Sequence, residues 1–160
     1  MNYIKLQQDL IKAANNRDEK GKMFNGFYLK REFETIIGPN QSQVFVIPNE
    51  QLYIDVEKVF NGREVPTFEN VLYKIENNEN YTFLKNEDVL ERHVYNKKKI
   101  DVYRFENSNL NEKIYLDKKL MKYYDMDKLV LFGGDNRQPI RVYEDNTFVG
   151  IVCPTLIQND

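Results

Sequence analysis

The chain of 160 residues has one cysteine, one histidine, no tryptophan and only two alanines. A single cysteine cannot form an intramolecular disulfide, which is typical of a reducing compartment. Zinc sites built from several histidines or several cysteines are excluded because the chain has only one residue of each type. No segment approaches the roughly 18 apolar residues of a membrane span, and residues 1–6 lack the apolar core of a signal peptide. We therefore expect a cytoplasmic protein with no metal and no cofactor.

Aromatic and aliphatic residues are plentiful. Hydrophobic residues make up 41% of the chain and aromatic residues 13%, which favours a packed core over disorder. A chain of this length buries roughly two-thirds of its unfolded surface, so it needs neither a disulfide nor a metal to fold. The sequence predicts one α+β domain over residues 1–160, with possible sub-units at 1–63 and 79–157.

The charged residues show a compositional bias and nearly cancel. Lysine exceeds arginine by sixteen to seven, and asparagine is abundant while alanine is scarce. This bias suggests an AT-rich genome, such as that of a low-GC bacterium or its phage. The net charge of −2 gives no general attraction to nucleic acid, so binding to DNA would require a local basic patch.

The first part of the chain predicts a mixture of helix and strand. We expect a strand at residues 3–6 and a helix at 7–16, followed by strands at 23–30, 33–37 and 44–47. Residues 38–41, Gly-Pro-Asn-Gln, are typical of a turn. Residues 48–60 fit either a strand or a helix. We favour the helix, because proline and asparagine at its start and Asn61-Gly62 at its end are plausible boundaries.

The last third of the chain has clearer signals. Residues 113–116 predict a strand, and Asp117 is a suitable N-cap for a short helix that runs through Tyr124. Three further strands are expected at 129–132, 140–143 and 147–152, with turns between them. The order is β-α-β-β-β, and the first 47 residues can be read in the same order. Two such units predict a mostly antiparallel sheet with short helices.

This order resembles the sliding-clamp fold, whose domains each contain two β-α-β-β-β units. Residues 113–157 are similar to the closing unit of the bacterial DNA polymerase III beta subunit. The similarity lies in the strand and helix of 113–124, the Gln138-Pro-Ile140 segment and the terminal Val152-Cys-Pro154. Residues 65–72 resemble the Pro-acidic-aromatic segment that precedes a new clamp domain, followed by a strand at 81–84 and a helix from Asn86.

The resemblance covers less than half of the chain and departs from the family in three ways. A bacterial clamp protomer carries three domains, whereas this chain has room for about one, and the basic residue that normally follows the terminal segment is missing. Thr155 stands where a clamp has a hydrophobic residue after the terminal proline. The fold implied by the resemblance turns its helices towards DNA. The resemblance implies a non-enzymatic protein that contacts DNA or the replication machinery, and a single domain of this kind would have to form oligomers to enclose DNA. From the composition, we expect the protein to be encoded by a phage or mobile element.

Several basic residues are candidates for contacts with DNA. Lysine and arginine side chains would bind phosphates without reading bases. The run at 97–99 lies between Tyr95 and Tyr103, and aromatic rings beside basic residues can stack on bases. The alternative interpretation is an ordinary solvated surface. The candidates are Lys12, Arg17, Lys97, Lys98, Lys99, Lys118, Lys119 and Lys122.

Charge also divides along the chain. Residues 64–91 contain seven carboxylates and two lysines, whereas residues 92–104 are mainly basic. The change of sign could bring the two segments together or could mark surfaces with different partners. The second hypothesis is a protein-binding accessory factor, or an inhibitor of a host enzyme, that uses this acidic surface. Its candidate residues are Glu76, Glu79, Glu87 and Asp88.

Catalytic motifs are weak, so we expect a binding protein and no enzyme. His93 is predicted to lie on a helix, and sequence alone leaves a His93–Cys153 pair open. Cys153 follows an apolar strand, where a buried thiol is typical. The Gly-Gly-Asp-Asn segment at 133–136 joins two strands and lacks the residues of a phosphate-binding loop.

Overall fold

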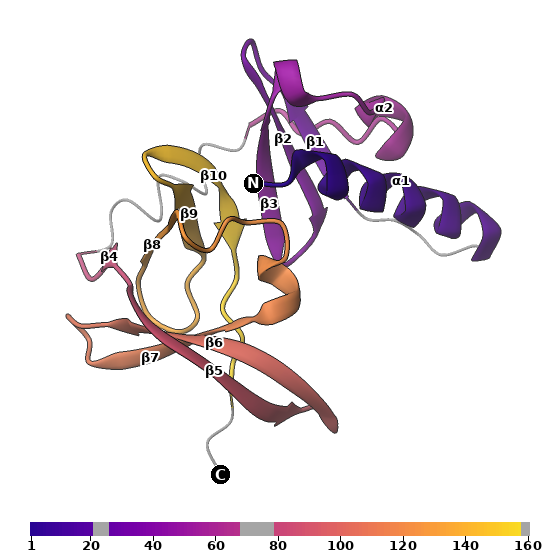
Figure 1. Ribbon diagram of the computed structural model, residues 1–160. Helices are drawn as coiled ribbons and strands as arrows, with labels where there is room; N and C mark the ends of the chain where they lie inside the picture. The colour runs from indigo at the N-terminus through magenta and orange to yellow at the C-terminus, as the bar shows by residue number, and fades with distance from the viewer. Residues whose placement is uncertain (21–25, 68–78, 158–160) are drawn as a thin grey trace.

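The computed structural model describes residues 1–20, 26–67 and 79–157, and the side chains of 17–20 are outside this description. Within these residues the protein has a few short helices and two antiparallel sheets (Figure 1). The predicted α+β class is therefore confirmed. None of the helices in the described ranges combines the length and the apolar character needed to cross a membrane.

The larger sheet joins two meanders. The N-terminal meander consists of β1 (Phe27–Lys30), β2 (Glu34–Asn40) and β3 (Gln43–Pro48). The C-terminal meander consists of β8 (Leu129–Gly133), β9 (Ile140–Glu144) and β10 (Thr147–Val152). Strand β3 pairs with β10, and the short β4 (Thr82–Phe83) adds to the far edge. The strands predicted at 44–47 and over the last third of the chain are thereby confirmed.

The smaller sheet is a hairpin with a third strand. It contains β5 (Lys85–Tyr95), β6 (Lys98–Asn107) and β7 (Glu112–Asp117) in that order. Asn96 and Lys97 form the turn of the hairpin and have φ angles of 49° and 64°. Two central residues with positive φ are typical of a two-residue type I′ turn. The β5–β6 hairpin projects away from the rest of the molecule (Figure 1).

The N-terminal helix begins earlier than predicted. Helix α1 spans Tyr3–Lys20, so the strand predicted at 3–6 is wrong. The reason is a helix cap at Asn2, whose side-chain Oδ1 accepts a hydrogen bond of 3.0 Å from the backbone N–H of Lys5. The first unit is therefore one helix followed by β1–β3, and the expected leading strand of a β-α-β-β-β unit is absent from these described residues.

Two other predicted elements differ from the structure. The helix expected from Asn86 is wrong, because β5 occupies this segment and pairs with β6. The predicted turn at 38–41 is misplaced, since β2 continues to Asn40 and the turn lies at residues 41–42. The Asn40 side chain stabilises that turn by accepting a 2.8 Å hydrogen bond from the N–H of Ser42.

The ambiguous segment at 48–60 is only partly helical. A 3₁₀ turn, η1 (Asn49–Gln51), and a single helical turn, α2 (Val56–Val59), are separated by extended residues. A second 3₁₀ turn, η2 (Lys118–Met121), replaces the longer helix predicted after Asp117. Of the predicted strand at 23–30, residues 27–30 are observed as β1, and residues 23–25 lie outside the described ranges.

One hydrophobic core holds the helix and the two sheets together. Leu6 and Leu10 of α1, Phe45 and Ile47 of β3, Leu131 and Val142 of the C-terminal meander, and Phe105, Ile114 and Leu116 of the smaller sheet all belong to this cluster.

A buried amide links α1 to the extended segment before α2. Gln7 has no exposed surface. Its Nε2 donates to the carbonyl oxygens of Tyr3, at 3.1 Å, and Gln51, at 2.9 Å. Its Oε1 accepts hydrogen bonds from the backbone N–H groups of Tyr53 and Ile54, at 2.9 and 3.3 Å. One side chain therefore satisfies buried backbone groups that regular secondary structure leaves open.

We predict that Gln7→Leu lowers the free energy of unfolding by about 2–3 kcal/mol, because backbone groups at residues 51–54 lose their hydrogen bonds to this buried side chain. Chemical denaturation followed by circular dichroism measures this change. The matched control is Gln8→Leu, since Gln8 is exposed on the same helix. Equal destabilisation by both variants would contradict the role assigned to Gln7.

Candidate functional site

The short helix η2 is fixed at both ends. The Asp117 carboxylate caps it by accepting a 2.9 Å hydrogen bond from the N–H of Lys119, as the sequence predicted. The Asp117 N–H in turn donates to the Thr155 hydroxyl at 3.2 Å. At the other end, Nε2 of Gln43 donates to the carbonyl oxygen of Leu120 at 2.5 Å. The helix is thus held in place by β3 and by the C-terminal segment.

Apolar residues at the end of η2 and directly after it anchor this helix in the core. Met121, Tyr123 and Tyr124 are all buried. The Phe45 ring of β3 lies 5.7 Å from the Tyr123 ring and 5.9 Å from the Tyr124 ring, measured between centroids. Because the apolar side chains point inward, the lysines of the same segment remain exposed. The buried side of this segment is therefore apolar and its exposed side is basic.

A groove of about 510 Å³ lies between η2 and the β5–β6 hairpin. Its apolar lining includes Tyr103, Met121, Tyr124 and Met126. Four lysines and two aspartates also line it: Lys99, Lys118, Lys119, Lys122, Asp101 and Asp117. The groove thus brings together four of the lysines predicted to bind DNA, from two separate segments of the chain.

The two aspartates of the groove are engaged with other groups. Asp101 accepts a 2.9 Å hydrogen bond from Arg92 Nε, and this contact, with a smaller effect of Lys118, lowers the pKa of its carboxyl group. Asp117 is occupied as the cap of η2. By contrast, Lys99, Lys118 and Lys119 form no ion pair with any side chain in the described ranges. The groove therefore carries three lysine charges that no carboxylate in the described ranges neutralises.

Lys122 is shared between the groove and helix α1. Its Nζ lies 3.5 Å from the Asp9 carboxylate and 4.9 Å from the centre of the Tyr123 ring. Tyr123 donates its hydroxyl hydrogen to Asp9 at 2.5 Å. This bond, followed by the charge of Lys122, lowers the pKa of Asp9, while burial and then Asp9 raise the pKa of Tyr123. Helix α1 and η2 are therefore neighbours, and Lys122 has a structural role.

The remaining basic candidates lie elsewhere. Lys97 and Lys98 are exposed at the tip of the hairpin, which is a strand-to-strand turn and not the expected end of a helix. Lys12 is exposed on α1 and does not line the groove. Arg17 lies within α1, and its side chain is outside the described residues.

The hairpin adds exposed apolar side chains beside the groove. In the register of β5 and β6, Leu90 lies opposite Tyr103 and Val94 opposite Lys99. Directly opposed residues of antiparallel strands point to the same face. Leu90 and Val94, which are 49% and 70% exposed, therefore extend the apolar lining along the hairpin.

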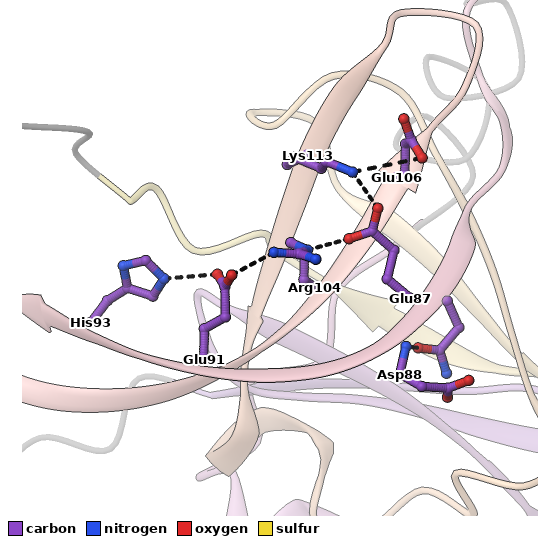
Figure 2. A network of polar contacts seen from close by, with 8 residues as sticks. Glu87, Asp88, Glu91, His93, Arg104, Glu106 and Lys113 are labelled. Carbon is purple, nitrogen blue, oxygen red and sulfur yellow. Dashed lines mark hydrogen bonds and ion pairs between the residues drawn. The ribbon is translucent and has the colours of Figure 1, made fainter.

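A polar network that sequence reasoning missed covers the other face of the smaller sheet (Figure 2). Arg104 of β6 pairs with Glu87 and, at 2.5 Å, with Glu91 of β5. Lys113 of β7 pairs with the same Glu87, and Glu91 contacts His93 Nε2 at 2.9 Å. The hydrogen bond from Lys113 and then that from Arg104 lower the pKa of Glu87, and His93 followed by Arg104 lowers that of Glu91.

The acidic candidates do not form one surface. Glu87 is engaged by two cations, whereas Asp88 beside it is exposed and its N–H donates to Asn86 (Figure 2). Glu79 is exposed before β4, and Glu76 lies outside the described residues. Residues 85–91 of the acidic segment lie beside the basic segment, because β5 pairs with β6. This part of the chain follows the first of the two predicted alternatives, and residues 68–78 lie outside the described ranges.

His93 and Cys153 have different partners in the structure. His93 lies on strand β5 and not on the predicted helix; it contacts Glu91, and its ring packs edge-on against Tyr115. The Cys153 thiol contacts the carbonyl oxygen of Gln41 at 3.7 Å, and burial raises the pKa of the thiol. No contact among the described residues joins them into a nucleophile pair.

Comparisons with protein-family models, with curated proteins and with solved structures find no match to this chain. The function is therefore argued from the basic groove and its surroundings.

We predict that Arg104→Met destabilises the protein at neutral pH, since Glu87 and Glu91 lose a charged hydrogen-bond donor. The folded-state pKa of both carboxyls is lowered. Their contribution is therefore complete above the ordinary glutamate pKa of 4.5 and is lost as the pH falls through the lowered values. Thermal melts measure this effect: the difference in melting temperature between the variant and the native protein should become smaller as the pH falls through this range.

The control for this prediction is Arg92→Met. The Arg92 side chain is 67% exposed in its pair with Asp101, and exposed pairs contribute roughly 0–1 kcal/mol. A difference for Arg104→Met that stays constant below pH 4.5 would show that packing of its side chain, and not the charge network, is responsible.

Proposed function

We propose that this protein binds single-stranded DNA through the basic groove and acts by binding, without catalysing a reaction. The observation that carries the proposal is the convergence of Lys99 of the hairpin with Lys118 and Lys119 of η2 on one groove. These lysines belong to separate segments and meet only because η2 is fixed against β3.

The charge of the groove suits a phosphate backbone. Three of its lysines form no ion pair in the described part of the chain, so binding of an anion does not have to break an existing pair. Lysine ammonium groups attract phosphates as point charges and do not distinguish bases. Binding of this kind releases counterions and weakens steeply as salt is added.

The apolar lining and the size of the groove favour a single strand. A half-buried Tyr103 and the exposed Leu90 and Val94 lie beside the lysines, and unstacked bases can pack on such side chains. The groove of about 510 Å³ is in the range of small-ligand sites. It has room for a few nucleotides of one strand.

The resemblance of residues 113–157 to the closing unit of a sliding clamp supports a role in DNA replication. The observed order of β7, η2, β8, β9 and β10 follows the β-α-β-β-β order of that unit. Replication proteins are then further partners, and the composition supports a phage or mobile-element origin. The unpaired cysteine supports a cytoplasmic location. The acidic alternative, binding to a host protein, is less favoured because Glu87 is already engaged by Arg104 and Lys113.

The test is binding of a labelled single-stranded oligonucleotide, measured by fluorescence anisotropy over a range of salt concentrations. We expect the triple variant Lys99→Gln, Lys118→Gln, Lys119→Gln to bind more weakly at low salt. The slope of log affinity against log salt should fall by about 2, because each phosphate contact with a single strand contributes about 0.7.

The matched control removes the same charge from exposed lysines outside the groove, in the triple variant Lys5→Gln, Lys58→Gln, Lys85→Gln. Its salt dependence should remain that of the native protein. Failure of the native protein to retain DNA at low salt would overturn the proposal, and so would an equal loss in the two triple variants.

A further inference from the structure

The edges of the two sheets differ in how they are protected. At the β1 edge, Tyr28 exchanges backbone hydrogen bonds with Arg63 and Val65, at 3.1 and 2.9 Å. The opposite edge of that sheet is the two-residue β4. At the β7 edge of the smaller sheet, the Tyr115 carbonyl accepts a 2.8 Å hydrogen bond from the N–H of Thr155. Three edges are thus covered or short.

Strand β5 forms the fourth edge and is long and open. It has eleven residues, and among the described residues it pairs with β6 alone. Every second N–H and C=O group of such a strand points away from its partner. Exposed edges of this length act as templates for a further strand unless something blocks them.

The outer part of β5 is regular and the inner part is not. The register with β6 shifts between Asn86 and Val89, and Asp88 within this bulge has a φ angle of 53°. A bulge of this kind interrupts pairing and bends the strand. The stretch that can accept another strand is therefore residues 89–95, which runs to the hairpin turn.

Residues 89–95, Val-Leu-Glu-Arg-His-Val-Tyr, are complementary to their own reverse about Arg92. An antiparallel copy centred on Arg92 places Leu90 opposite Val94 and Val89 opposite Tyr95. It also places Glu91 opposite His93, two residues that already contact one another within each copy. Each pair occurs twice by symmetry, and apolar pairs across strands stabilise a sheet.

The exposed side chains agree with this register. Leu90, Val94 and Tyr95 are 49%, 70% and 42% exposed, and all three are large hydrophobic residues on one strand. At the centre, the two copies of Arg92 would meet. Each is already paired with its own Asp101 on β6 at 2.9 Å, which partly neutralises each guanidinium, although the two Arg92 side chains remain neighbours across the interface.

We infer that residues 89–95 of β5 form the interface of a homodimer, in which two copies pair antiparallel about Arg92 and join their smaller sheets into one. The occupant of this edge is a second copy of the chain, since the pattern is complementary to itself. A two-fold axis perpendicular to the joined sheet leaves the same face of each copy on the same side. Both basic grooves then open on one side.

The register is tested by disulfide trapping in a Cys153→Ser background. Directly opposed residues of antiparallel strands have Cα atoms about 4.5–5.5 Å apart, within reach of a disulfide. The variant Arg92→Cys should therefore form a covalent dimer under mild oxidation. Leu90→Cys and Val94→Cys should not do so alone, because each residue lies about 13 Å from its own copy, but a mixture of the two should.

Association itself is measured by sedimentation over a concentration series. We expect the native chain to be a dimer that dissociates on dilution, as small interfaces do. Val94→Lys should weaken dimerisation about tenfold or more, because it replaces the apolar contact with Leu90 by an ammonium group in both symmetric pairs. Leu156→Lys, a substitution at an exposed apolar residue outside β5, is the control and should leave the dimer unchanged.

Two outcomes would overturn the inference. One is a chain that sediments as a monomer throughout and gives no covalent dimer with Arg92→Cys. The other is a dimer that differs from the one inferred. A dimer that forms equally well with Val94→Lys would have its interface elsewhere, and a dimer that is trapped by Leu90→Cys alone would have another register. Neither outcome depends on whether DNA binds in the groove.

Discussion

The pairing of β3 with β10 is the constraint on which the rest of the structure depends. It joins the two meanders through three residue pairs, including Phe45 with Gly150. Glycine is required there, because a Cβ atom would clash with the carbonyl oxygen of Val44. The same strand β3 then positions the site, since Gln43 binds the carbonyl of Leu120 and Phe45 packs against Tyr123 and Tyr124. A contact between distant segments thus determines where the lysines of η2 lie.

The elements that sequence predicted well are those with strong local signals. Strands β7 and β9 alternate apolar and polar residues, while β8 and β10 are mainly apolar runs. Recognisable turns separate β8, β9 and β10, and Asp117 is a typical cap. The errors arose where local signals compete. Residues 86–95 have the composition of a helix, but pairing with β6 makes them a strand. Residues 3–6 suit a strand, but the cap at Asn2 begins a helix there.

The sequence predicted which residues could form the candidate site but not how they would be arranged. The lysines at 97–99 and 118–122 were recognisable by residue type, but sequence gave no sign that Lys99 and not Lys97 would face η2. That selection follows from the β5–β6 register and the turn at Asn96-Lys97. The network around Arg104 was missed because its partners lie on three strands, where Glu87 and Lys113 are 26 positions apart. Only the tertiary pairing brings such residues together.

The distribution of charge along the chain is a poor guide to the charge of its surfaces. Glu87 and Glu91 of the acidic stretch are neutralised by Arg104 of the basic stretch, because β5 and β6 are paired and these side chains meet on one face. The opposite face of the same hairpin contacts η2. There the Asp117 carboxylate caps η2, and the Asp101 carboxylate is paired with Arg92. Positive charge therefore accumulates in the groove although the whole chain is slightly acidic. What decides the electrostatics of the site is which charges folding has already paired.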